Sequence, residues 1–253
     1  MAGASSIKHA SRILLTGGSG TLGTELQKHL PEVYAPPHSE LDVLDAAGLL
    51  ATVRAYRPDV IVHSAAFTDV AGAEDERAAC WAVNVGGTHA VVAAARATAG
   101  RLVHISTDYV FEGTQPAPGG YREDDPPGPV RNYYALSKLV AEEVARTLPD
   151  ALVVRTSFRP NAWPYPVAFT DLFTSQDYVD VVAPEIALAI RHLAAIPFPT
   201  LHIATDRKSA FELARRRRPD VVAGSKRDAS VALPDDITLN VARWRALRRQ
   251  LTS

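Results

Sequence analysis

The sequence predicts an α/β protein in which a doubly wound parallel sheet carries a small C-terminal lobe. Short apolar runs with the composition of buried strands occur at residues 12–16, 60–66, 101–107, 151–156 and 200–204. Helical patterns separate these runs, at residues 22–30, 78–98, 180–193 and 209–217, and in a long stretch that begins near Tyr134. A glycine-rich turn joins the first strand to the first helix. Strands that alternate with helices in this way form parallel sheets.

The composition is that of an ordinary globular protein. Of the 253 residues, 47% are hydrophobic and 22% are charged, so the chain can bury a sizeable core and is neither disordered nor fibrous. Its 27 basic and 28 acidic residues give a formal net charge of -1, which provides no overall positive field for nucleic acid or an acidic membrane. The run of arginines at 215–218 fits the solvated, cationic end of a helix.

The single cysteine, Cys80, excludes an intramolecular disulfide, and no Cys/His cluster has the spacing of a metal site. Residues 1–11 lack the apolar core of a signal peptide and are expected to form a short disordered lead-in. No apolar run is expected to be long enough to span a bilayer. Together these features predict a cytoplasmic protein without a metal.

The glycine-rich turn is the first functional motif. Its glycines, at positions 17, 18, 20 and 23, satisfy both G-x-G-x-x-G and G-x-x-G-x-x-G. Between a strand and a helix, such a turn lets the backbone approach a pyrophosphate, and the helix N-terminus supplies free N–H groups and a positive dipole end. The sequence therefore predicts a Rossmann-type NAD(P) site with cofactor contacts from Gly17, Gly20, Thr21, Leu22 and Gly23.

The adenosine end of this site lacks the usual acid. A short second strand is expected at residues 32–35, but residues 36–39, where a ribose-binding acid normally follows, contain none. Asp42 and Val43 are candidates for the adenine side, and the small Ala65 and Ala66 after the next strand permit close approach of the cofactor. The choice between NADH and NADPH is open at this point.

The most informative stretch begins at Tyr134, after a loop rich in glycine and proline. Lys138 follows one helical turn later, on the same face of the helix. We expect the Lys138 ammonium to lie near the phenol and lower its pKa, which would make Tyr134 a proton donor or acceptor near neutral pH. An isolated Y-x-x-x-K is more often an ordinary helix with an exposed lysine, so the motif depends on its context.

The ordered motifs supply that context. After the glycine turn come E-L-D-V at 40–43, A-A-F-T at 65–68, S-T-D-Y-V-F at 106–111, Y-x-x-x-K at 134–138 and R-T-S at 155–157. From residue 12 to about residue 158, the chain resembles the extended short-chain dehydrogenase/reductases, and among them the dTDP-4-dehydrorhamnose reductase branch.

The resemblance implies a mechanism and a substrate class. It assigns Thr107, Tyr134 and Lys138 to hydride-coupled proton transfer with NAD(P)H, and it gives Tyr134 and Lys138 a second role in holding the cofactor. The implied reaction is reduction of a keto group on a nucleotide-activated 4-keto-6-deoxysugar, with dTDP as the expected nucleotide. Thr68, Asp108 and Trp163 are candidate substrate contacts, although Trp163 fits core packing equally well.

Departures from the family pattern leave alternatives. The similar 4,6-dehydratases carry a second acid after Thr-Asp, whereas Tyr109 stands here, so reduction fits better than dehydration. We expect residues 1–156 to form the NAD(P)-binding domain and residues 157–253 a shortened substrate lobe packed on it. Because that lobe sets the substrate, a nucleotide-sugar epimerase or a non-catalytic dinucleotide-binding subunit stays open. The expected partner is a small nucleotide-sugar, without nucleic acid or membrane, and a homodimer is one option.

Overall fold

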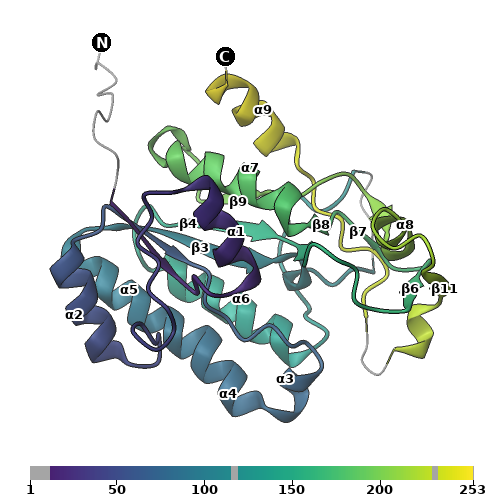
Figure 1. Ribbon diagram of the computed structural model, residues 1–253, viewed down its shortest axis with the longest axis horizontal. Coiled ribbons are helices and arrows are strands. Elements are labelled where there is room, and N and C mark those ends of the chain that lie inside the picture. Colours follow the sequence, from purple (N-terminus) through teal and green to yellow (C-terminus); the bar gives the residue numbers. More distant parts are fainter. Residues whose placement is uncertain (1–11, 115–118, 230–232, 253) are drawn as a thin grey trace.

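The computed structural model describes residues 12–114, 119–229 and 233–252, so the lead-in expected at residues 1–11 lies outside the described residues. The central element is a five-stranded sheet with the order β1-β2-β3-β4-β9, in which every pair of neighbours is parallel. Its strands are β1 (Ile13–Thr16), β2 (Val60–His63), β3 (Arg101–Thr107), β4 (Leu152–Thr156) and β9 (Thr200–His202). The predicted doubly wound α/β fold is confirmed (Figure 1).

The sheet has its switch point at β1. On one side β1 pairs with β2, and on the other it forms a single parallel bridge between Leu14 and Tyr34. The strand expected at residues 32–35 is therefore reduced to this bridge. After β1 the chain passes to Tyr34 on one side of this strand, and then crosses to the other side to form β2. This change of direction opens a crevice at the carboxyl ends of the strands.

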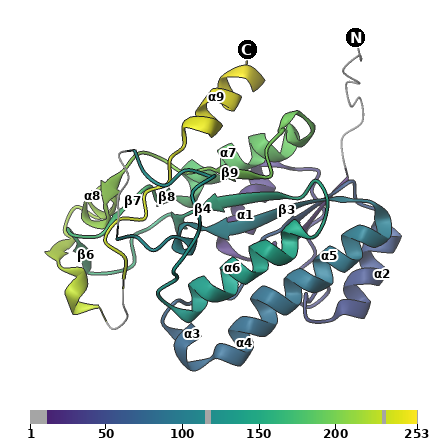
Figure 2. The same cartoon turned by 180° about the vertical axis from the view of Figure 1, so that it is seen from behind.

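Helices cover both faces of the sheet. Helices α1 (Thr21–His29) and α7 (Val179–Arg191) lie on one face, and α2 (Ala46–Tyr56), α5 (Gly87–Thr98) and α6 (Tyr133–Arg146) lie on the other (Figures 1 and 2). Each layer has its own apolar core: Leu26 and Ile186 belong to the first, and Leu49 and Val91 to the second. The sequence did not predict α2 or the C-terminal helix α9 (Ala242–Leu251).

The helix predicted at residues 78–98 is present, but the expectation that no apolar run is long enough to span a bilayer is not met. Helix α4 (Arg77–Trp81), a π-helical turn at Ala82–Gly86 and α5 run on continuously, after the short α3 (Gly72–Asp75). Arg77–Thr98 covers 22 residues and is apolar enough, by length and composition, to cross a membrane. Half of its most apolar window is buried inside the protein, as in the core helix of a globular fold.

The lobe lies at the end of the sheet where β4 leads into it (Figure 1). It contains short paired strands and one helix: β5 (Phe158–Arg159) with β8 (Asp177–Tyr178), β6 (Val167–Phe169) with β11 (Val222–Gly224), β7 (Phe173–Thr174) with β10 (Lys208–Ser209), and α8 (Ala210–Arg215). Trp163, Tyr178 and Leu213 share its core.

The chain passes between sheet and lobe more than once. Helix α7 and strand β9 follow residue 156 in sequence, yet both pack with the sheet. Trp244 of α9 also belongs to the core of the α1 and α7 layer. The expected division at residue 156 thus assigns several elements to the lobe that in the structure pack with the sheet.

Candidate active site

A cavity of about 760 Å³ lies at the carboxyl ends of the strands, between the sheet and the lobe. Its lobe side is formed by residues 157–160, Pro164, Tyr165 and Gln176. Most of the sequence-predicted site residues line it: Gly17, Gly20, Thr21, Leu22, Gly23, Asp42, Val43, Ala65, Ala66, Thr68, Thr107, Tyr134 and Lys138. The other two candidates, Asp108 and Trp163, do not line it.

The glycine turn brings backbone against backbone. Gly17 has a φ of +73°, and a Cβ there would lie 2.6 Å from the backbone nitrogen of Ala65. A Cβ on Gly23 would lie 2.1 Å from the carbonyl oxygen of Gly17. Helix α1 then begins at Gly20 with no side-chain cap and no acidic residue in its first turn. Its N-terminal N–H groups are thus free for an anion, and these residues fit the diphosphate of a dinucleotide.

The adenosine end carries a histidine where an acid would select NAD. His38 lines the cavity, and its Nε2 lies 4.0 Å from Oδ2 of Asp42. The other oxygen of Asp42 accepts a hydrogen bond from the backbone N–H of Leu44 at 2.9 Å. Val43 packs close to Gly87, where an added Cβ would lie 2.8 Å from Cγ2 of Val43. Local contacts therefore fix Asp42 and Val43 at the edge of the cavity.

Tyr134 lies in the first turn of α6, which begins with a side-chain cap. Oδ1 of Asn132 accepts a hydrogen bond from the backbone N–H of Ala135 at 2.8 Å. The ring of Tyr134 is 8% exposed and meets the Tyr109 ring edge-on, with the ring centroids 6.0 Å apart. Burial raises the pKa of Tyr134 well above its usual value, and a hydrogen bond with Thr107 opposes this only in part.

The expectation of a lowered tyrosine pKa is therefore wrong for this structure. The physical reason is burial of the phenol, and Lys138 does not offset it: its ammonium donates a hydrogen bond to the carbonyl oxygen of Ile105 at 2.8 Å. Lys138 is itself buried, and burial lowers its pKa to about 8, against the opposing charge of Glu142. The cost of burying a phenolate thus outweighs the hydrogen bond from Thr107, and Tyr134 holds its proton at neutral pH.

Thr107 ends β3 and faces two partners. Its hydroxyl donates to Oδ1 of Asp108 at 3.1 Å and accepts from the backbone N–H of Tyr109 at 3.2 Å. Asp108 is fully buried behind it, where Oδ2 accepts from Thr174 of the lobe at 3.4 Å. Burial raises the pKa of Asp108 to about 6, and hydrogen bonds from Ser157 and Thr107 oppose the shift.

The expected substrate contacts fare differently in this structure. Thr68 lines the cavity and is exposed. Asp108 does not reach it, because the side chain turns inward to the two threonine hydroxyls. Trp163 is 6% exposed and packs in the lobe core, edge-on to Tyr165 with the ring centroids 5.9 Å apart.

Several residues that line the cavity were not predicted from the sequence. Arg159 and Gln176 meet across the lobe side of the cavity, where Nε of Arg159 donates to Oε1 of Gln176 at 3.0 Å. The Arg159 guanidinium also lies over the rings of Trp163 and Tyr165, at 5.5 and 5.8 Å from their centroids. Arg159 could have been found from its place just after the R-T-S motif, whereas Gln176 has no local sequence pattern.

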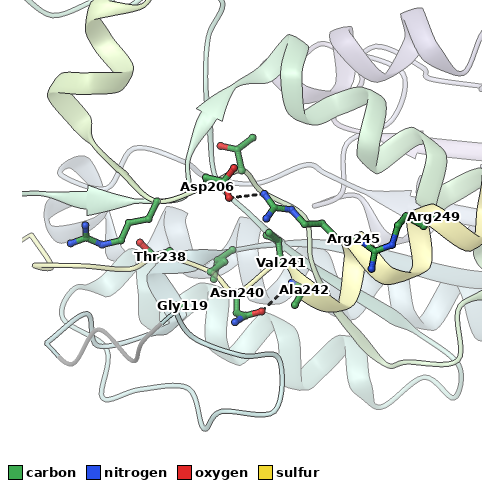
Figure 3. A pocket seen from close by; sticks show the side chains of 11 residues that line it. Gly119, Asp206, Thr238, Asn240, Val241, Ala242, Arg245 and Arg249 are labelled. Atoms are coloured by element: carbon green, nitrogen blue, oxygen red, sulfur yellow. Dashed lines mark hydrogen bonds and ion pairs between the residues drawn. The ribbon is translucent and has the colours of Figure 1, made fainter.

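A second cavity, of about 400 Å³, lies where α9 meets the lobe. Arginines line it, but carboxylates already neutralise two of them: Arg245 donates to Asp206, and Arg207 to Asp236, each at 2.6 Å. Figure 3 shows Asp206 and Arg245 reaching toward each other, with Arg249 farther along α9. This cavity contains none of the predicted site residues. Among the described residues no group of His, Cys, Asp and Glu could hold a metal.

Comparison with known proteins fits this geometry. Residues 11–187 match the family model of the RmlD substrate binding domain, which is more than half of the chain. The chain belongs to this family.

Curated relatives match part of the chain. The chain is 42% identical over 153 residues to a dTDP-4-dehydrorhamnose reductase of Streptomyces griseus, a match that covers 58% of this chain and 49% of that protein. It is 37% identical over 155 residues to the spore coat polysaccharide biosynthesis protein SpsK of Bacillus subtilis, covering 58% of this chain and 53% of that one. The chain thus matches about half the length of these curated relatives.

The structural likeness within the RmlD family extends further. A crystal structure of a dTDP-4-dehydrorhamnose reductase from Bacillus anthracis, in complex with NADP, superposes with a TM-score of 0.82 and 28% identity. The superposition covers 96% of this chain and 93% of that one. The lobe therefore has counterparts in a solved structure, even though the family model ends at residue 187.

Proposed function

We propose that this chain is an NAD(P)H-dependent reductase of a keto group on a nucleotide-activated 4-keto-6-deoxysugar, with dTDP as the nucleotide. The observation that carries the proposal is the meeting of Thr107, Tyr134 and Lys138 with the glycine turn of residues 17–23 in one cavity. The names of the Streptomyces griseus and Bacillus anthracis relatives support the substrate class and the cofactor.

In this mechanism the bound nicotinamide supplies the hydride. The carbonyl carbon accepts it, and the negative charge that grows on the carbonyl oxygen takes up a proton from Tyr134, so the ketone becomes an alcohol. Burial keeps the Tyr134 phenol protonated until that charge appears. Thr107 would hydrogen-bond the same oxygen, and Lys138 would compensate the tyrosinate left behind and hold the ribose of a bound cofactor.

The lobe side of the cavity would hold the nucleotide. The hydrogen-bond partner of Arg159 there is the neutral Gln176 and not a carboxylate. Its positive charge is therefore available to bind a diphosphate. Tyr165 is 50% exposed and lines the cavity beside Arg159, which suits stacking with a base. Thr68 remains a candidate contact for the sugar.

The proposal also covers the setting of the enzyme. The substrate is a small molecule, and a net charge of -1 favours neither nucleic acid nor an anionic membrane as a partner. A cytoplasmic location fits a chain whose single cysteine, Cys80, is free and buried. A homodimer stays a prediction.

The test is consumption of NAD(P)H, followed by absorbance, with a dTDP-4-keto-6-deoxysugar. We expect turnover by the natural protein and a loss of at least about 1000-fold in Tyr134→Phe, because the proton donor is removed. Tyr133→Phe is the matched control, since the Tyr133 ring lies outside the cavity against Trp81, with the centroids 6.2 Å apart. Turnover that survives in Tyr134→Phe would refute the mechanism, and interconversion of sugars without net oxidation would indicate an epimerase.

A further inference from the structure

A buried ion pair lies directly behind the candidate active site. Glu142 is fully buried one helical turn beyond Lys138 on α6, and Arg155 of β4 is 2% exposed. Arg155 forms a two-pronged contact with the carboxylate: Nε donates to Oε1 at 3.0 Å and Nη2 donates to Oε2 at 2.9 Å. Burying two charges is costly, so the sheet retains this pair against an energetic penalty.

The carboxylate of Glu142 also ties α6 to the end of β3. The Ser106 hydroxyl donates to Oε1 of Glu142 at 2.5 Å, and Ser106 immediately precedes Thr107. Lys138 donates to the carbonyl oxygen of Ile105, the residue before Ser106. Two side chains on one face of α6 thus bind successive residues of the strand that ends in Thr107.

The pair of Glu142 and Arg155 also contacts a residue that follows Thr107 in the chain. The Arg155 guanidinium lies over the ring of Phe111, 5.0 Å from its centroid, and Phe111 follows the short turn that begins at Asp108. Arg146, one turn beyond Glu142, donates to Oε2 of that carboxylate at 3.1 Å. Thr107 is therefore flanked on both sides by residues that the Glu142 and Arg155 pair contacts.

We propose that Glu142 is a positioning residue of the active site, whose carboxylate, fixed by Ser106 and Arg155 one helical turn beyond Lys138, holds the Lys138 ammonium at the end of β3. The inference rests on the proposed function for the part that Lys138 plays in turnover. Its structural claim concerns only residues of this chain and can be measured without substrate or cofactor.

Of the groups around Lys138, Glu142 compensates its charge most, and Cys80 adds a smaller contribution of the same sign. Titratable side chains that influence Lys138 or Glu142 come from five elements: Cys80 of α4, His63 of β2, His104 of β3, Arg155 of β4, and Arg146 of α6 itself. Burial lowers the pKa of His63 to about 3 and that of His104 well below its usual value, so both rings are neutral at pH 7. Burial alone would raise the pKa of Glu142, but the hydrogen bonds and charge of Arg155 bring it below the usual value.

The experiment is an NMR titration of Lys138 in the full chain without ligand, with ¹³C-labelled lysine and assignment by Lys138→Arg. The natural protein should titrate near pH 8. In Glu142→Gln the midpoint should fall by about one pH unit, because a nearby negative charge is lost. Glu143→Gln is the matched control: this neighbour is 65% exposed and pairs with Arg146 on the outer face, so the midpoint should not move.

A second variant protects the test against misfolding. Glu142→Gln leaves Arg155 buried without its partner, whereas Glu142→Gln with Arg155→Met removes both charges and keeps the volume. The double variant should show a smaller fall in the Lys138 midpoint, because the loss of the Arg155 charge partly offsets the loss of the Glu142 charge. An unchanged midpoint in both variants, or an equal fall in Glu143→Gln, would overturn the proposal.

A kinetic readout then separates this proposal from the proposed function. In an active enzyme, the alkaline limb of the pH profile of kcat/KM should move to lower pH in Glu142→Gln by the same amount. A purely structural role would lower activity equally at every pH. If the NMR midpoint falls but no variant reduces a keto sugar, Glu142 positions Lys138 as proposed and the assigned reaction is wrong.

Discussion

The sheet and the lobe deliver residues to the same cavity in different ways. In the sheet, each site residue belongs to a motif that is local in sequence: Gly17 follows β1, Thr107 ends β3 and Tyr134 opens α6. In the lobe, strands of two or three residues pair across long stretches of chain, as when Phe173 of β7 meets Ser209 of β10. The sheet side is thus fixed by local backbone rules, and the lobe side by long-range packing.

Likeness to other proteins divides along a similar line. Sequence matches to named relatives cover 58% of the chain, and the family model ends at residue 187. The structural match covers 96% of the chain at 28% identity. The lobe therefore has a backbone arrangement found in a solved structure, at an overall identity low enough for many side chains to differ, and side-chain differences are one way in which a fold changes its substrate.

The largest effect on binding is expected on the sheet side, from Gly23→Ala. The new Cβ would come 2.1 Å from the carbonyl oxygen of Gly17, so the turn must open and the diphosphate contacts are lost. We expect the Kd of NADPH, measured by fluorescence titration, to rise at least about 100-fold. Gly86→Ala is the control, because a Cβ there has nothing within 4 Å. Equal affinities of the two variants would place the dinucleotide elsewhere.

The fold of the sheet could be predicted from sequence because its helices are long and periodic and its strands are apolar runs between them. The run at residues 101–107 corresponds to β3, and the helix expected at 180–193 corresponds to α7 within a few residues. In the lobe, the helix expected at 209–217 corresponds to α8. The lobe strands could not be predicted, because a two-residue strand such as Asp177–Tyr178 has no periodicity to detect. Helix α2 was missed although Asp45 caps it, accepting from the backbone N–H of Gly48 at 3.0 Å.

The site shows the same limit. Spacing alone put Tyr134 and Lys138 on one face of α6, and both line the cavity. Spacing could not give the direction of the Tyr134 pKa shift, because that depends on how deeply the fold buries the ring. It also could not find Gln176, which reaches Arg159 only through the pairing of β5 with β8.

A smaller effect is expected on the lobe side, from Arg159→Ala. If Arg159 binds the diphosphate, the KM for the nucleotide-sugar should rise about 30-fold, which corresponds to about 2 kcal/mol for a charge-assisted hydrogen bond. The Kd of NADPH should not change, because the glycine turn is untouched. Arg215→Ala is the control, an exposed lobe arginine outside the cavity that lies over the Phe211 ring. A loss of NADPH affinity in Arg159→Ala would mean that the lobe side also contributes to cofactor binding, against this prediction.

The smallest effect is expected at Asp108, which joins the two sides through Thr107 of the sheet and Thr174 of the lobe. Burial raises its pKa from 3.8 to about 6 in the folded protein. Because the folded state binds this proton more tightly, the resulting stability is fully present below about pH 3.8 and is lost as the pH rises through about 6.

Asp108→Asn removes this titration and serves as the reference for it. From pH 7 to pH 5, the natural protein should gain about 1 kcal/mol in free energy of unfolding relative to Asp108→Asn. Urea unfolding of both proteins at the two pH values measures the difference, in which the titration of all other groups cancels. A difference that does not change with pH would mean that Asp108 ionises as freely as in an unfolded chain, so that the joint between sheet and lobe is open to water.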